Sequence, residues 1–472
     1  MTVHTPVILA ENRGLRLLRR VRRDLLGEFV RMMRRHGDFT WMELGGHRVL
    51  MLNDATGIQH VLQDNAASYR KSHFNQVLRP LLGDSIFLSE GATWRKQRHE
   101  AAPVFSSGNF AEMTTQIVGA TESMLNRWTP HIARDEPLCL NNETMTYTLD
   151  VVLRALFHEA REGVAPDMQT ALVTLLREAE HRIWSPLNLP QSLTYKIPKY
   201  RRARQFLDNL VGELAEARRC NAAYPDDLLS RLVAGYGTST HEQAALHDQI
   251  KSFLLAGHET TANGLVWTFC HLSRHPEIAR RVTQEVDQIL GDTLPTFESV
   301  KNLNYTRQVF DEVLRLYPPV WTMSRTAAAD DMIPLDNGDR IALPRDTVVM
   351  MSGYAVHRRE KYWDNPEAFD PDRFAPEAVA TRPKFSWFPF GGGPRLCLGF
   401  RFAQIESIVA IAMVVQRYRL CLVPGQNIAP MPIITLRPNG AVLFNIRPRG
   451  NKTCPVNFSA AQNAVPRCPM NF

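Results

Sequence analysis

Hydrophobic residues recur at helical spacing through most of the chain. Residues 14–36 form an amphipathic helical pattern, and helical patterns dominate from about residue 54 to residue 291. Proline and glycine interrupt the second region several times, which predicts a series of separate helices. We therefore expect a mainly helical protein.

Strand-like patterns are confined to the two ends of the chain. The segment 39–52 predicts a β-hairpin, because two hydrophobic runs flank Gly45 and Gly46. Strand patterns return late in the chain, at 341–344, 347–351 and 433–446. We expect strands from both ends to pair in one sheet. This favours one large domain over 1–450, mainly α with minor β, and a tail over 451–472.

One proline-free segment, from about His241 to Arg274, predicts an unusually long helix, and Pro276 ends it. At about 1.5 Å per residue this helix is roughly 50 Å long, enough to cross a domain. Its middle reads Ala-Gly-His-Glu-Thr-Thr over 256–261, and glycine and threonine are poor helix formers. We expect a local distortion there.

Composition and charge exclude several classes of protein. With 44% hydrophobic and 22% charged residues, the 472-residue chain is globular. The net charge of +7 does not require nucleic acid. The longest apolar run, 408–415, is too short to span a bilayer.

An arginine-rich segment lies near the start of the chain. It has no acidic residue and contains Arg13, Arg16, Arg19, Arg20, Arg22 and Arg23. The segment indicates either contact with an anionic surface or a solvated helix face. We favour the solvated face, because no aromatic residues lie among the arginines.

A single cysteine lies in a glycine-rich turn just before a helical pattern that begins at Phe400. The positive end of a helix favours thiolate over thiol, so Cys397 could be a nucleophile, a zinc ligand or an axial heme ligand. Zinc is disfavoured, because no second cysteine or histidine is near in sequence. A nucleophile would need a histidine base nearby in space, which the loop itself does not exclude.

The loop resembles the heme-binding segment of the cytochrome P-450 superfamily. The matching positions are Phe390, Gly393, Arg395, Cys397 and Gly399, with Ala403 as the usual extension. The resemblance implies heme b (iron protoporphyrin IX) with Cys397 as the iron ligand and the other positions as heme-binding residues. A cysteine thiolate pushes electron density onto the iron and favours O–O cleavage.

Other motifs agree with this family. Glu312 and Arg315 match E-x-x-R, and Arg373 in Pro-Asp-Arg-Phe would complete a structural triad. Trp94 and Arg98 match W-x-x-x-R, whose members contact a heme propionate in the family. Arg325 is expected to be a further propionate partner.

The middle of the long helix matches the family's oxygen-side motif. Ala256 and Gly257 would lie against the heme, and Gly257 is expected to leave room for dioxygen. Thr260 and Glu259 are the predicted catalytic pair: the hydroxyl holds a water and the carboxylate resupplies protons. His258 occupies the variable position, and we interpret it as structural or solvated.

By resemblance, a mostly apolar set of residues lines the substrate pocket: Phe74, Ile86, Phe87, Phe253, Val320, Trp321, Thr322 and Ile433. Such a lining predicts a hydrophobic substrate. A fatty acid, a terpenoid, a steroid and a polyketide all remain open.

The resemblance implies a monooxygenase that inserts one oxygen atom of O₂ into a hydrophobic small molecule. Only 69 residues follow Ala403, so we expect electrons from a separate ferredoxin or flavodoxin with its reductase, and NAD(P)H to act only through that partner. The expected protein is a cytoplasmic monomer.

The alternatives are a heme-thiolate peroxygenase or isomerase and, less favoured, a non-catalytic heme-binding sensor. The resemblance does not extend to the roles of the arginine-rich segment or of Cys454 and Cys468.

Overall fold

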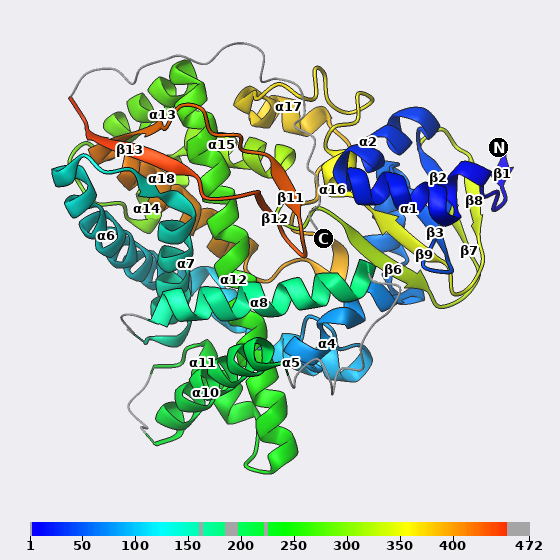
Figure 1. Ribbon diagram of the computed structural model, residues 1–472, viewed down its shortest axis with the longest axis horizontal. Helices are drawn as coiled ribbons and strands as arrows, with labels where there is room; N and C mark the ends of the chain where they lie inside the picture. Colours follow the sequence, from blue (N-terminus) through cyan, green and yellow to red (C-terminus); the bar gives the residue numbers. More distant parts are fainter. Residues whose placement is uncertain (1, 160–163, 185–196, 221–224, 451–472) are drawn as a thin grey trace.

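A computed structural model describes residues 2–159, 164–184, 197–220 and 225–450. Most helices occupy the left and centre of the view in Figure 1, and most strands lie on the right together with α1 and α2. The predicted tail, with Cys454 and Cys468, lies outside the described residues.

Helices make up most of the described chain, as the hydrophobic pattern predicted. They are α1 (Gly14–Arg23), α2 (Leu25–His36), α3 (Ala55–Gln59), α4 (Arg79–Leu82), α5 (Gly91–Ala101), α6 (Phe110–Arg134), α7 (Leu140–Phe157), α8 (Val164–Trp184), α10 (Pro198–Cys220), α11 (Leu228–Gly235), α12 (Thr240–Arg274), α13 (Pro276–Ile289), α14 (Phe297–Asn302), α15 (Asn304–Leu316), α16 (Gly353–Val356), α17 (Pro376–Thr381) and α18 (Phe400–Arg417). Short helical turns include η1 (Ala10–Asn12), η2 (His60–Asp64) and η9 (Gly393–Arg395).

The largest sheet joins the two ends of the chain, as expected. Its order is β2 (Phe39–Leu44), β3 (His47–Leu52), β9 (Val348–Met351), β6 (Met323–Ala327) and β4 (Tyr69–Lys71). Parallel pairing of β3 with β9 makes the connection, with Leu50 opposite Val349. The hairpin β2–β3 has the predicted bounds, and Gly45 and Gly46 form its turn with positive φ.

Three smaller sheets complete the β structure of the described residues. One contains β1 (Val3–His4), β8 (Arg340–Leu343) and β7 (Asp331–Pro334). The second contains β10 (Tyr418–Leu422), β13 (Leu443–Pro448) and β5 (Leu138–Cys139). The third pairs β11 (Pro430–Pro432) with β12 (Leu436–Pro438). The strand pattern predicted over 433–446 is thus divided between two sheets.

The single helix predicted over 14–36 is two helices. The chain breaks at Asp24, whose φ of −164° is not helical, and the Asp24 carboxylate accepts the Gly27 N–H at the start of α2. Because the short Asp24 side chain caps the next helix, the helix is interrupted there although the amphipathic pattern continues.

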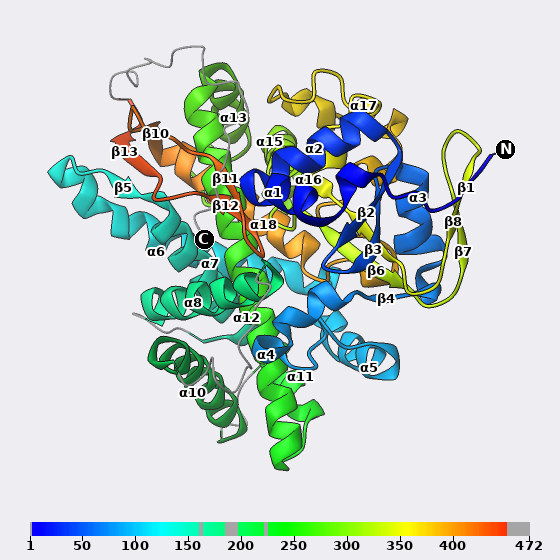
Figure 2. The same ribbon diagram turned by 45° about the vertical axis from the view of Figure 1, so that its right-hand side comes forward.

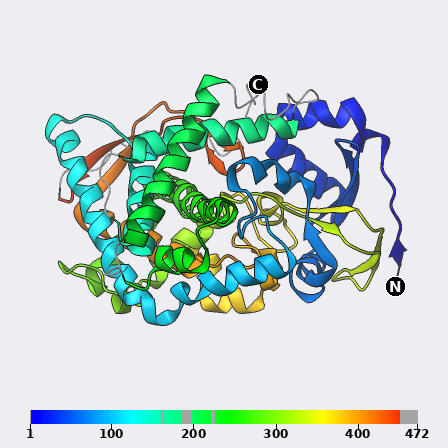
Figure 3. The same ribbon diagram turned by 90° about the horizontal axis from the view of Figure 1, so that it is seen from below.

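Helix α12 crosses the whole molecule (Figure 1), and Figure 3 shows it nearly end-on at the centre. Its 35 residues correspond to about 52 Å. Ser239 caps its start by accepting the Glu242 N–H, and all residues from Thr261 to Cys270 are buried. The expected distortion over 256–261 is absent, because burial against neighbouring helices outweighs the weak helix propensity of that segment.

A buried ion pair fixes the segment that leads to the cysteine turn. Arg315 and Glu312 are fully buried on α15, and the guanidinium donates two hydrogen bonds to the carboxylate at 2.6 and 2.8 Å. Arg315 also donates to the carbonyl oxygens of His357, Pro366 and Ala368. Removing one partner of such a pair typically costs about 3–5 kcal/mol.

Arg373 completes the cluster. Its Nε lies 3.6 Å from Glu312 Oε1, which also accepts the Asp370 N–H at 2.9 Å. The structure therefore brings the three triad residues together, and their hydrogen bonds hold the irregular segment 357–373 against α15. Every helix among the described residues is too short or too polar to cross a membrane.

Candidate functional site

The cysteine turn has a conformation that only glycine allows at position 393. Gly393 has a φ of 62°, and a Cβ there would lie 2.0 Å from the backbone oxygen of Leu62 in η2. A Cβ at Gly392 would lie 2.3 Å from the Phe385 ring. The glycines therefore let the turn pass directly over neighbouring backbone and aromatic side chains.

Cys397 follows this turn, three residues before α18. Its N–H donates to the Phe390 carbonyl oxygen at 3.0 Å. Burial raises the pKa of the Cys397 thiol, while the Gly399 N–H and the Arg98 guanidinium act in the opposite direction. Protein surrounds this side chain, yet it keeps accessible surface. The sulfur is therefore presented to a ligand instead of being packed into the core.

Four cationic side chains surround the turn without an ion pair to any described residue: Lys71, Arg98, Arg325 and Arg395. Burial, reinforced by repulsion from Arg325 and Arg395, lowers the pKa of Lys71 well below its ordinary value. Burial lowers the pKa of Arg395 to about 10. The Glu90 carboxylate opposes these shifts, but its oxygen accepts the backbone N–H of Lys71. The cluster therefore holds more positive charge than the surrounding protein neutralises.

Two of these cations are held by backbone carbonyls and by Trp94. Arg395 donates to the Ser89 carbonyl at 2.9 Å and lies 4.0 Å from the centre of the Trp94 ring, while its Nη1 is buried without a partner. Arg98 donates to the Leu396 carbonyl at 3.0 Å. The W-x-x-x-R motif thus places both of its residues against the cysteine turn.

Lys71 was not among the residues predicted from sequence. It lies directly opposite Arg325 in the antiparallel pair β4–β6. Two like charges opposite one another destabilise a sheet unless an anion lies between them. No local signal marks Lys71, because its position depends on a strand pairing between segments about 250 residues apart.

The oxygen-side residues on α12 have different surroundings. Ala256 is exposed although Leu254 and His258 nearby are buried, and Thr260 Oγ1 donates to the Ala256 carbonyl oxygen at 2.7 Å. This part of α12 therefore presents a small exposed face that contains a hydroxyl.

Gly257 faces away from that site. A Cβ at this position would lie 2.7 Å from Val152 on α7, so the glycine allows α7 and α12 to pack closely. The expectation that Gly257 leaves room for dioxygen stays a prediction. His258 is buried at the same interface, where burial lowers its pKa to about 4 and Thr148 donates to its carbonyl oxygen. The structural interpretation of His258 therefore agrees with its surroundings.

The Glu259 carboxylate is held by the β11–β12 hairpin. Its Oε1 accepts the Thr435 hydroxyl at 2.7 Å and lies 3.7 Å from Arg437 Nη2. Its other oxygen, Oε2, is buried without a partner. The carboxylate and the Thr260 hydroxyl are therefore adjacent in sequence but have separate partners. Thr435 and Arg437 were not predicted, because the hairpin is distant in sequence.

The predicted pocket residues come from four parts of the chain. Trp321 Nε1 donates to the Ile433 carbonyl at 2.9 Å, and Phe74 packs in the same apolar cluster as Trp321. The Ile86 N–H donates to Gln249 on α12 at 3.2 Å. The remaining members differ in burial: Phe253 is buried, Phe87 is exposed, and Val320 and Thr322 are half-buried.

These residues fit heme. The thiol supplies a soft metal ligand, and the cations supply donors for the two propionates, including an otherwise unpaired Nη1 on Arg395. Cys397, Lys71, Arg98, Arg325 and Arg395 would hold the group.

Gly393→Ala should prevent this turn from forming, because the new Cβ would collide with the Leu62 backbone oxygen. We expect the purified variant to hold less than about a tenth of the normal heme and to unfold at a lower temperature, since a clash with backbone has no easy relief. Gly338→Ala is the matched control, because Gly338 also has a positive φ but has nothing within 4 Å. Heme content in Gly393→Ala as high as in Gly338→Ala would contradict the predicted effect of the Leu62 contact.

Comparisons with known proteins agree with this geometry. The sequence profile of the family described as Cytochrome P450 matches residues 13–444. The protein LUTEIN DEFICIENT 5, chloroplastic, of Arabidopsis thaliana is 30% identical, over 83% of this chain and 68% of its own length. Cyclooctat-9-en-7-ol 5-monooxygenase of Streptomyces melanosporofaciens is 31% identical, over 85% of this chain and 86% of its own.

Pentalenene oxygenase of Streptomyces avermitilis is 27% identical, over 86% of this chain and 90% of its own. The family match covers most of the chain, including the cysteine turn, the buried ion pair and the motif on α12. The chain therefore belongs to the cytochrome P450 family, and it is a heme-thiolate monooxygenase that uses O₂ and electrons from a redox partner.

Proposed function

We propose that this monooxygenase oxidises a terpenoid. The observation that carries the proposal is the combination of an apolar pocket lining with relatives named for a cyclooctatenol and for pentalenene. Trp321 and Ile433 contribute buried apolar surface, and Phe253 contributes an aromatic ring from α12. Such a lining orients a substrate by shape and apolar contact, with little to bind a charged group.

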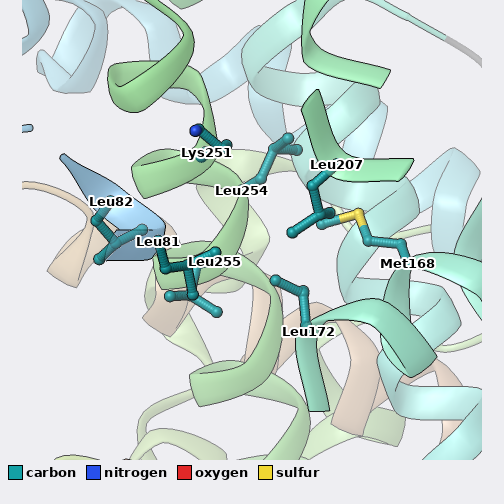
Figure 4. A pocket seen from close by; sticks show the side chains of 8 residues that line it. All are labelled: Leu81, Leu82, Met168, Leu172, Leu207, Lys251, Leu254 and Leu255. Atoms are coloured by element: carbon teal, nitrogen blue, oxygen red, sulfur yellow. The ribbon is translucent and has the colours of Figure 1, made fainter. Parts of the chain in front are cut away.

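A small apolar cavity, with room for about one water molecule, lies between α4, α8, α10 and α12 (Figure 4). Its lining is almost entirely aliphatic and consists of Leu81, Leu82, Met168, Leu172, Leu207, Lys251, Leu254 and Leu255. Lys251 is neutralised by Asp208 and Asp248, at 3.2 and 3.1 Å, so it offers no free cation to a carboxylate substrate.

Each group at the site has a role in this reaction. Heme bound by a cysteine thiolate supplies oxygen activation. Cys397 would provide that thiolate, and the cations beside the turn would bind the propionates. The Thr260 hydroxyl would hold a water, and the Glu259 carboxylate, which the β11–β12 hairpin holds, would supply protons to that water. The buried residues of α12 keep bulk water out.

An optical titration of the ferric protein tests the substrate class. Displacement of iron-bound water shifts the Soret band, so we expect a saturable shift with cyclic terpene hydrocarbons and alcohols. Long-chain fatty acids should produce at least about tenfold weaker binding, because none of the predicted lining residues carries a charge that would bind the carboxylate. A saturable shift with fatty acids alone would overturn the proposal.

Thr260→Ala should retain heme and substrate binding but lose controlled proton delivery. Product formation should fall by about 10²-fold, the usual contribution of a positioned proton-transfer group, while peroxide release takes up the reducing equivalents. Thr260→Ser keeps the hydroxyl and should remain largely coupled. Unchanged coupling in the alanine variant would reject the proton-delivery role.

We further propose that the electron donor is an acidic ferredoxin or flavodoxin that binds beside the cysteine turn. Arg95 and Lys96 on α5 and Arg401 on α18 are exposed, and α5 is joined to the turn through Arg98 and Leu396. Positive charge at this face would steer an acidic partner toward the thiolate side.

Arg95→Glu/Arg401→Glu should slow reduction of the heme by a [2Fe–2S] ferredoxin by about tenfold or more at low salt, and should weaken the salt dependence of the rate. Stopped-flow reduction measures this. Arg48→Glu/Arg340→Glu makes the same change in charge at exposed residues of β3 and β8 and should leave the rate nearly unchanged. Equal slowing by both pairs would mean that net charge alone is responsible.

A further inference from the structure

The arginine-rich segment at the start of the chain has no part in the site described above. Residues 11–36 contain nine arginines and three carboxylates, and so supply six of the seven excess positive charges of the chain. The three carboxylates are already occupied: Glu11 pairs with Arg35, Asp24 with Arg31 and Glu28 with Arg20. Arg16, Arg19 and Arg23 of α1 form no ion pair with these three carboxylates.

Helix α1 turns one face into the core and the other toward solvent. Leu17 and Val21 are buried in the cluster that contains α2. Leu15, Arg16, Arg19 and Arg23 lie on the opposite side of the helix and are all exposed. None of these arginines forms an ion pair with a residue in the part of the chain that the structure describes. This is more than a solvated helix face, because a large aliphatic side chain lies among the charges.

The extended segment before α1 adds to this surface. Ile8 points inward and bridges to Trp41, so alternation directs Val7 and Leu9 outward. Val7 is 63% exposed, Leu9 43% and Leu15 69%, and they are among the most exposed large aliphatic side chains of the described residues. We define the N-terminal surface as Val7, Leu9, Arg13, Leu15, Arg16, Arg19 and Arg23. Figure 2 shows α1 on the near side of the molecule, next to α2.

We propose that the N-terminal surface binds an anionic lipid bilayer. Unpaired arginines are attracted to lipid phosphates, and exposed aliphatic side chains can enter the interface between headgroups and acyl chains. A nucleic acid would use the charges but not the aliphatic side chains, and the surface lacks aromatic residues for base stacking. An acidic protein partner would have to neutralise the arginines and at the same time cover the aliphatic side chains.

The mode of attachment follows from the buried face of α1. Its apolar stripe is already packed in the core, so the helix cannot insert its hydrophobic face into the bilayer. The protein instead adsorbs through charge, with three aliphatic side chains as shallow contacts. Binding should therefore depend strongly on salt, because the Debye length falls to about 3 Å at 1 M.

Sedimentation of the purified holoenzyme with vesicles tests this surface. We expect binding to an equal mixture of phosphatidylglycerol and phosphatidylcholine, no binding to phosphatidylcholine alone, and loss of binding at high salt. Arg16→Gln/Arg19→Gln should weaken partitioning by about 25-fold, at about fivefold per arginine. Leu9→Ser/Leu15→Ser should weaken it by about tenfold.

Arg280→Gln/Arg419→Gln is the matched control. It removes the same charge from exposed positions on α13 and β10, which lie far from α1 in Figure 1, and should leave binding within about twofold of the original value. Equal loss in this control would overturn the proposal, because net charge alone would then explain binding. Undiminished binding of the leucine variant would also overturn it. Retention by a DNA duplex without vesicle binding would identify a nucleic acid as the partner instead.

Discussion

The constraint on which the site depends is positive charge that the protein does not neutralise. Lys71 and Arg325 lie opposite one another in a sheet, and Arg98 and Arg395 approach the same cysteine turn. Each loses hydration on burial, and no carboxylate forms an ion pair with it among the described residues. Such an arrangement is costly for the protein alone. A dianionic ligand reverses that cost, so ligand binding stabilises the folded protein.

Rigid elements maintain this arrangement against its own repulsion. Arg315, paired with Glu312, donates hydrogen bonds to three backbone carbonyl oxygens of the segment after β9. That segment leads into the cysteine turn. Helix α12 provides the opposite wall, and Gly257 lets α7 pack against it at close range. The site therefore lies between the Glu312–Arg315 ion pair, with its backbone partners, and the long apolar helix α12. Both the ion pair and the helix would be unstable without their buried partners.

Sequence patterns predicted the parts of the fold that local chemistry decides. The β2–β3 hairpin and the glycine turn before Cys397 follow from short segments with strong preferences, and the length of α12 follows from a long segment without proline. The break at Asp24 was missed, because a capping carboxylate does not disturb the hydrophobic period. Burial preserved the α-helix over 256–261 although its local propensity is weak.

Long-range pairing decided what local patterns could not. Lys71 became part of the cationic cluster only through the pairing of β4 with β6. The direction of Gly257 also depended on where α7 packs, which a motif on a single helix does not specify. A motif identifies which residues can act, but packing decides which way they face.

The surroundings of Glu259 extend this point to the reaction. Its carboxylate is buried, and the hydroxyl of Thr435 holds one oxygen while the other has no partner. The turn that carries Thr435 also carries Ile433, whose carbonyl oxygen accepts the Trp321 N–H, and the Leu436 N–H donates to the Pro319 carbonyl. One short turn therefore holds both the Glu259 carboxylate and the Trp321 indole. Because the same turn makes both contacts, a movement of this turn would displace the group that holds the carboxylate.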